Sequence, residues 1–192
     1  MHCRQPNVTF PVGLRVKIAS LTLLLVLLSG CTAKAIKQSR ASALINRVDV
    51  SDRITTSGQP TPTQLDRMEK SDYELVVNLS PLGTLSSVPG EERIVTDKGI
   101  DYVHIPVDGL ASALEQFEIF SDTLDRYSGK NILVHCQVNM RASLFMFMYQ
   151  VVHEEIDPDV AYRHVTAIWV PGNQWLNFMD QVFARYKIEY QP

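Results

Sequence analysis

A single cysteine at the junction of a predicted strand and a predicted helix constrains this chain more than any other feature. Residues 131–143 read Asn-Ile-Leu-Val-His-Cys-Gln-Val-Asn-Met-Arg-Ala-Ser, which indicates a β-strand that ends at Cys136 and a helix that begins near Arg141. Residues 137–140 then form a tight loop whose N–H groups, with the positive end of the helix, can bind an oxyanion such as phosphate. The same field favours the thiolate form of Cys136, and the Arg141 guanidinium can bind two phosphoryl oxygens at once.

The first 30 residues have the pattern of an export signal. Three basic residues and no acidic residue accompany an apolar run, Ile18–Leu28, that is shorter than the roughly 20 residues of a bilayer span. The tetrapeptide that ends at Cys31, Leu-Ser-Gly-Cys, resembles the bacterial lipobox. This resemblance implies that residues 1–30 are a lipoprotein signal peptide and that Cys31 is the lipid attachment site. Because Thr32 stands where aspartate signals inner-membrane retention, it also implies a periplasmic chain anchored at the outer membrane. A plain secretory signal is the alternative.

The net charge and the number of cysteines limit the possible partners of the chain and indicate a role for Cys136. Without residues 1–30 the chain has 15 Lys and Arg against 21 Asp and Glu, a net charge of −6, so nucleic acid is not expected as a partner. An anionic substrate would need a local positive site. Lipidation of Cys31 would leave Cys136 as a lone thiol in an oxidising compartment, which indicates a chemical role. A buried, inert cysteine is the alternative.

The rest of the chain predicts one α/β domain at residues 47–190, preceded by a polar tether at residues 31–46. Strands alternate with helices and are followed by helices alone, which indicates a central, mostly parallel sheet of about four or five strands flanked by helices. Ligands of such sheets bind beyond the carboxyl ends of the strands, where Cys136 lies. The predicted strands are a short hairpin or a bent edge strand over Arg47–Thr56 and single strands at Leu75–Leu79, Tyr102–Val107 and Asn131–His135.

Local signals mark the starts of several helices. Thr61 and Gln64 form one capping box, with Pro62 in the first turn, and Ser112 and Glu115 form another. Asp157 is expected to cap a further helix. A short helix is expected at Glu91–Lys98, and the last helix is expected at roughly Gln174–Tyr186. Between them, an almost wholly apolar helix is expected from Arg141 to Val152, and such a helix should be buried.

These residues carry a resemblance to a known superfamily. Val134-His135-Cys136 followed by Arg141 resembles the signature of cysteine-dependent protein tyrosine and dual-specificity phosphatases. Together with residues 56–60, 77–79 and 101–108, it is similar to a bacterial branch related to the phosphatase domain of beta-lactamase-hydrolase-like proteins. The likeness covers residues 47 to about 185 and implies the phosphatase-like fold.

The resemblance implies a phosphoric monoester hydrolase that forms a phosphate ester on Cys136, without metal or other cofactor. Its substrate would be a phosphorylated protein or small molecule. Asp108 would be the general acid, although Asp-Gly is also a common turn pair. His135 is expected to support the loop by hydrogen bonding, and the four histidines at 104, 135, 153 and 164 lack the spacing of a zinc site. The implied phosphate-binding residues are Gln137, Val138, Asn139, Met140 and Arg141.

The loop departs from the superfamily pattern. Four residues without glycine separate Cys136 from Arg141, whereas most members have five residues, usually with a glycine. Asn139 could supply the left-handed backbone conformation that glycine usually gives. Rhodanese-type sulfurtransferases also have short loops, so sulfur transfer is an alternative, as is a catalytically weak domain that only binds anions.

Overall fold

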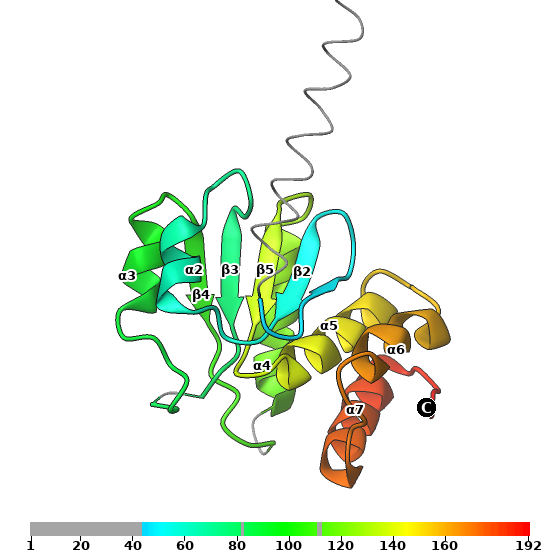
Figure 1. The fold of residues 1–192 in the computed structure, drawn as a ribbon. Helices are drawn as coiled ribbons and strands as arrows, with labels where there is room; N and C mark the ends of the chain where they lie inside the picture. Colours follow the sequence, from blue (N-terminus) through cyan, green and yellow to red (C-terminus); the bar gives the residue numbers. More distant parts are fainter. Residues whose placement is uncertain (1–43, 82, 111–112) are drawn as a thin grey trace, which may run out of the picture. The chain divides into compact units, whose positions relative to one another are not determined.

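A five-stranded, mostly parallel sheet forms the centre of the chain (Figure 1). The computed structural model describes residues 44–81, 83–110 and 113–192, so the predicted signal peptide, Cys31 and Ser112 lie outside the described residues. The strand order is β1-β2-β5-β3-β4, and only β1 runs antiparallel to its neighbour. The predicted fold class is confirmed. The strands are β1 Val48–Asp49, β2 Ile54–Ser57, β3 Leu75–Asn78, β4 Asp101–His104 and β5 Ile132–His135.

Strand β5 has a parallel partner on each side, which fixes the position of the residue that follows it. Val134 lies opposite Thr56 of β2 and Val77 of β3. All four residues of β5 are buried, as expected for a central parallel strand covered on both faces. Cys136 therefore lies at the carboxyl edge of the sheet, directly after its middle strand.

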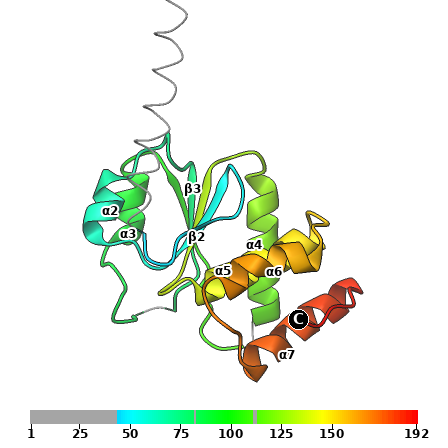
Figure 2. The same cartoon turned by 45° about the vertical axis from the view of Figure 1, so that its right-hand side comes forward.

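The helices cover the two faces of the sheet unequally. Figures 1 and 2 show α2 and α3 on one side and α4, α5, α6 and α7 on the other. Apolar residues that alternate along the strands make the two cores: Leu75, Val77 and Val134 belong to the larger one, and Val76 and Leu133 to the smaller one. The helices are α2 Pro62–Arg67, α3 Glu91–Thr96, α4 Ala113–Arg126, α5 Met140–Val152, α6 Pro158–Thr166 and α7 Asn173–Tyr186.

Helix α5 is the rigid support behind the cysteine loop. Its residues from Ala142 to Val151 are all buried, as the apolar sequence predicted. The ring of Phe145 packs edge to face against the rings of Phe117 and Phe120 in α4, with centroid distances of 5.9 and 5.7 Å. Because α5 is fixed by the larger core, its first turn holds the preceding loop in one position.

The predicted helix signals are borne out where the structure describes them. Thr61 and Gln64 form the reciprocal capping box, and Asp157 accepts a hydrogen bond from the Val160 N–H. The strand expected at Tyr102–Val107 ends earlier, at His104. Two backbone bonds continue beyond it, to the Asn78 carbonyl at the end of β3 and to the Leu79 carbonyl that follows, but Pro106 has no N–H and interrupts the regular ladder.

The packed chain begins before residue 47, where the sequence placed the domain boundary. Leu44 is buried in the smaller core, and Ile45 and Asn46 form hydrogen bonds with the domain. Residues 44–46, expected to belong to the tether, are thus part of the folded unit. Among the described residues, no helix combines the length and apolar character needed to cross a membrane.

Candidate active site

Cys136 follows β5 directly and is completely buried. Its N–H donates to the Ser57 carbonyl at the end of β2, over 3.2 Å. The adjoining loop is also tied to β2, because the Gln59 N–H donates to the Gln137 carbonyl over 3.1 Å and Gly58 pairs with Val138 as an isolated antiparallel bridge. The thiol thus lies beneath a loop that is fixed to the neighbouring strand.

Asn139 gives the short loop its turn. Its φ of 72° is in the left-handed region, which asparagine tolerates better than most residues, so the expectation for this position is confirmed. Asn139 is the N-cap residue of α5, yet its side chain makes no capping hydrogen bond to the helix. Its Nδ2 instead donates to Thr56 Oγ1 over 3.1 Å and to the Asn46 carbonyl. The first N–H groups of α5 are therefore left without a side-chain acceptor, which suits an oxyanion.

Arg141 lies in the first turn of α5 and is half-buried. Its Nη1 donates to Gln137 Oε1 over 3.2 Å, so the two ends of the loop are joined by a side-chain contact. Its Nε is buried without a hydrogen-bond partner among the described residues. An unsatisfied, buried guanidinium nitrogen can receive an anionic oxygen with a gain in free energy.

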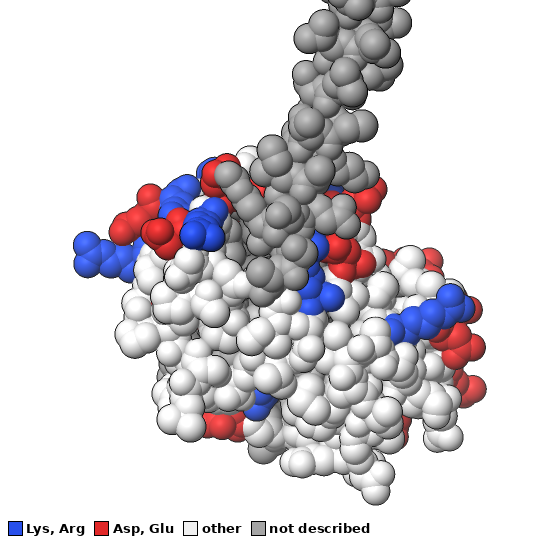
Figure 3. Space-filling view, in the orientation of Figure 1, with Lys and Arg blue, Asp and Glu red and all other residues white. Residues whose placement is uncertain are grey.

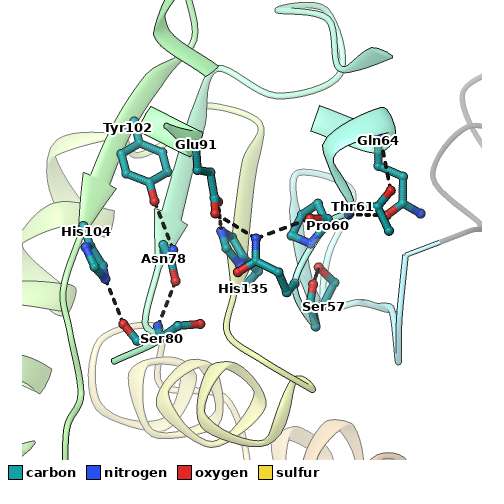
Figure 4. A network of polar contacts seen from close by, with 12 residues as sticks. Ser57, Pro60, Thr61, Gln64, Asn78, Ser80, Glu91, Tyr102, His104 and His135 are labelled. Atoms are coloured by element: carbon teal, nitrogen blue, oxygen red, sulfur yellow. Dashed lines mark hydrogen bonds and ion pairs between the residues drawn. The ribbon is translucent and has the colours of Figure 1, made fainter. Parts of the chain in front are cut away.

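A buried polar cluster lies behind the loop (Figure 4). Nε2 of His135 is 2.7 Å from Oε1 of Glu91, although the contact is not aligned as a hydrogen bond. Gln59 Nε2 donates to the other Glu91 oxygen over 2.7 Å. The three side chains are almost excluded from solvent, so the cluster joins α3, β5 and the segment after β2 by polar contacts in a low-dielectric region. His135 was expected to support the cysteine loop by a hydrogen bond. This role stays a prediction, because the contact of the His135 side chain is with Glu91 and not with the loop.

A second set of polar contacts lies on β3 and β4 (Figure 4). Asn78 Nδ2 donates to the Tyr102 hydroxyl over 3.0 Å, and Asn78 Oδ1 accepts from the Ser80 N–H over 2.8 Å. A ring nitrogen of His104 lies 2.8 Å from the Ser80 carbonyl. Burial, with a further contribution from the Glu91 carboxylate, raises the pKa of Tyr102 far above its usual range. Tyr102 is thus a neutral hydrogen-bonding group at physiological pH.

Asp108 comes from a different element than the other two predicted catalytic residues, Cys136 and Arg141. It lies on the loop that follows β4, at the same carboxyl edge as Cys136, with β3 between β4 and β5. Its side chain is exposed and has no hydrogen-bond or ion-pair partner among the described residues. Gly109 next to it has a φ of 100°, which only glycine adopts readily. The position thus combines an exposed carboxyl group with a local turn.

Two apolar side chains are exposed on the loop. Val138 and Met140 are 44% and 36% exposed, and they flank the buried Asn139. Figure 3 shows that charged side chains gather at the upper left and right of this view, whereas the part below the strands carries few of them. An anion that reached the loop would therefore be held mainly by Arg141 and by the N–H groups of the loop and of α5.

Comparison with known proteins supports the same reading of the fold. No family model matches the chain. Over 115 residues, or 58% of the chain, its sequence is 26% identical to the beta-lactamase hydrolase-like protein of Xylella fastidiosa. The match covers 26% of that protein, so the chain spans about a quarter of the length of the curated relatives it matches.

Solved structures agree over most of the chain. A candidate phosphatase of the DUF442 group from Shewanella putrefaciens matches with a TM-score of 0.70 and 28% sequence identity, over 78% of this chain and 98% of that chain. Human DUSP28 matches with a TM-score of 0.54 and 16% identity, over 74% of this chain and 95% of that chain. The domain has a phosphatase-like fold of the dual-specificity type. The resemblance that the sequence motifs indicated is confirmed at the level of fold.

Several residues around the site escaped the sequence analysis. Glu91 was placed only as the start of a short helix, and Gln59 only as part of a motif. Asn46 was assigned to the tether. No local pattern marks these roles, because each depends on a contact with a residue far away in the sequence. The charge of Glu91 on an otherwise ordinary helix gave no sign that its carboxylate is buried.

Proposed function

We propose that the domain is a phosphatase that hydrolyses phosphomonoesters through a covalent phosphate on Cys136. The observation that carries this proposal is the loop itself. Cys136 ends the central strand, Asn139 turns the loop without capping α5, and Arg141 follows with a buried nitrogen that lacks a partner. The likeness to a candidate phosphatase of Shewanella putrefaciens supports the same activity.

In the first step, the Cys136 thiolate attacks phosphorus and the bond from phosphorus to the leaving oxygen breaks. The phosphoryl oxygens are held by N–H groups of residues 137–141 and by the guanidinium of Arg141, which stabilise the charge of the transition state. Asp108 donates its proton to the departing alkoxide or phenolate. The products of this step are an alcohol and a cysteinyl phosphate.

In the second step, water attacks the cysteinyl phosphate. The Asp108 carboxylate accepts a proton from that water, the bond from sulfur to phosphorus breaks, and inorganic phosphate leaves with the thiolate restored. What supports the role of Asp108 is its exposed position on a loop at the carboxyl edge of the sheet. The two steps need no metal and no other cofactor.

The test is phosphate release from an aryl phosphate by the purified full-length protein in the presence of a chelator. We expect hydrolysis by the wild-type protein and loss of hydrolysis in Cys136→Ser. Activity at the level of Cys136→Ser on aryl phosphates, phosphopeptides and phosphorylated sugars or lipids would overturn the proposal.

Sulfur transfer is the second candidate, because four residues between Cys136 and Arg141 also suit the loop of a rhodanese-type enzyme. In that case Cys136 would take a sulfur atom from thiosulfate and release sulfite. A persulfide on Cys136 after incubation with thiosulfate, together with transfer of that sulfur to cyanide, would favour this alternative over hydrolysis.

We also propose that Cys31 carries a lipid anchor and that the domain faces the periplasm at the outer membrane. Support comes from the sequence Leu-Ser-Gly-Cys after an apolar run and from Thr32 after the cysteine. Metabolic labelling with a fatty acid, followed by fractionation of the envelope, tests the proposal. Labelling that persists in Cys31→Ser would contradict it.

A further inference from the structure

The chain just before the domain is fastened to the candidate oxyanion loop. Ile45 accepts a backbone hydrogen bond from Gly58 over 2.7 Å, and Asn46 Nδ2 donates to the Val138 carbonyl over 3.0 Å. In return, Nδ2 of Asn139 donates to the Asn46 carbonyl. The Asn46 amide thus binds the Val138 carbonyl, and the Asn139 amide binds the carbonyl of Asn46, which is 93 residues away in the sequence.

Gly58 shows how closely the three segments pack. A Cβ atom at this position would lie 2.9 Å from the Gln137 carbonyl oxygen and 3.1 Å from the Ile45 Cβ. Both distances are shorter than ordinary van der Waals contacts, so glycine at position 58 lets Ile45 and the Gln137 carbonyl approach the residue after β2 this closely. The contact between Asn46 and the loop is therefore part of a tightly packed arrangement.

Both asparagines have the same special backbone conformation. Asn46 has a φ of 48° and Asn139 a φ of 72°, both in the left-handed region that residues other than glycine, asparagine and aspartate rarely adopt. One hydrogen bond, from Asn139 Nδ2 to the Asn46 carbonyl, joins the two residues, and the Asn46 side chain is bound to the Val138 carbonyl. Together with the bond to Thr56 Oγ1, the bond to the Asn46 carbonyl directs the Asn139 amide away from α5.

We propose that Asn46 is a positioning residue for the candidate active site. It fixes the Val138 carbonyl and, through its own carbonyl, the Asn139 side chain, so that the N–H groups at the start of α5 stay available to a phosphoryl group. Without the Asn46 side chain, the Val138 carbonyl loses its hydrogen-bond donor and the loop that carries Asn139 is held less firmly, while Asn139 Nδ2 keeps Thr56 Oγ1 as an acceptor. The inference rests on the proposed phosphatase function, and it makes the last residue of the predicted tether a part of the catalytic scaffold.

The test compares three variants of the full-length protein in detergent. Asn46→Gly keeps the left-handed backbone and removes the amide, whereas Asn46→Asp keeps the shape of the side chain but cannot donate to the Val138 carbonyl. Asn177→Ala is the matched control, because Asn177 is an exposed asparagine on α7. Each variant is melted thermally first, and measurements are made well below the lowest melting temperature.

Two readouts separate the positioning role from the proposed function. The first is the concentration of inorganic phosphate that half-protects Cys136 from alkylation, and the second is the alkylation rate without phosphate. We expect both Asn46 variants to need about fivefold to tenfold more phosphate than the wild type, as for the loss of one hydrogen bond, and to differ in alkylation rate. Asn177→Ala should match the wild type in both.

The outcomes are distinct. If the wild type binds phosphate and the Asn46 variants bind it equally well, the positioning role is overturned while the phosphatase proposal stands. If the wild type neither binds phosphate nor hydrolyses phosphate esters, the phosphatase proposal falls. In that case an altered alkylation rate in both Asn46 variants supports the control of the loop by Asn46, and an unaltered rate overturns it.

Discussion

Nε2 of His135 lies 2.7 Å from Oε1 of Glu91, and the exposed fractions of the two side chains are 0% and 5%. Glu91 belongs to α3, on the side of the sheet opposite α5, whereas His135 immediately precedes Cys136. The contact therefore joins the small-core side of the domain to the strand that carries the proposed nucleophile. Gln59 contributes a third contact from the segment after β2, so three separate parts of the chain meet at one carboxylate.

We predict that Glu91→Ala destabilises the domain by about 3 kcal/mol, because it leaves His135 and Gln59 buried without their shared partner. Urea denaturation measures the free energy of unfolding. Glu92→Ala is the matched control, since Glu92 is the exposed neighbour in the same first turn of α3. Its effect should stay within about 0.5 kcal/mol. Equal effects of the two substitutions would show that the buried contact does not stabilise the fold.

Arg141→Lys keeps the positive charge but removes the planar fork and the buried Nε. We expect kcat/KM for an aryl phosphate to fall by a factor of ten or more, because charge-assisted hydrogen bonds to the phosphoryl oxygens are lost, at about 1.5 to 3 kcal/mol each. Arg163→Lys on the exposed face of α6 serves as control and should behave as the wild type. Unchanged kinetics in Arg141→Lys would argue against a bidentate contact.

The variant Asp108→Asn tests whether Asp108 is the general acid, by comparing substrates whose leaving groups differ in their need for a proton. An alkyl phosphate needs a proton on its leaving oxygen, so its hydrolysis should slow by roughly 100-fold. A nitrophenyl phosphate, whose leaving group is stable as an anion, should be affected much less. Asp52→Asn is a suitable control, because Asp52 is exposed and lies in the turn before β2, at the opposite edge of the sheet. An equal loss on both substrates would contradict proton donation by Asp108.

The stability of the domain should also depend on pH through Glu74. Hydrogen bonds from Lys130 and from the Asn131 N–H lower the pKa of Glu74 below its ordinary value of 4.5. A carboxyl group with a lower pKa in the folded state stabilises the fold above its unfolded pKa, and this stabilisation is lost as the pH falls through the folded-state pKa.

Glu74→Gln should therefore lower the melting temperature at neutral pH, and the difference from the wild type should shrink as the pH falls below 4.5. Glu189→Gln, at an exposed position near the end of the chain, should show no such pattern. A difference between Glu74→Gln and the wild type that stays constant down to acidic pH would mean that the ionised carboxylate is not the stabilising group.

The architecture could be predicted because its determinants are local. Apolar strands, the capping box of Thr61 and Gln64, and the apolar helix after Arg141 each carry their own signal over a few residues. The candidate oxyanion loop is local too, since Cys136 and Arg141 lie in one short segment. The left-handed turn at Asn139 followed from the same segment, because the loop lacks glycine.

The contacts that hold the site together could not be predicted in this way. Asn46 lies 92 residues from Val138, and it comes at the end of a segment, residues 32–46, whose mostly small and polar residues are typical of a linker. The burial of Glu91 depends on two partners from other segments, and a single sequence does not indicate that they meet. The sequence also placed the end of β4 too late, at Val107 and not at His104. The alternation of apolar residues continues past His104, but Pro106 cannot donate the hydrogen bond that a regular strand needs.

The central claim is that Cys136 carries the phosphoryl group during turnover. The most direct test is mass spectrometry of Asp108→Asn protein that has been mixed with an aryl phosphate and quenched in acid, because slow hydrolysis of the intermediate should let it accumulate. We expect one phosphate per chain on the peptide that contains Cys136, and none in the double variant that also has Cys136→Ser. An unmodified Cys136 in protein that is still turning over substrate, or phosphate on another residue, would contradict the account.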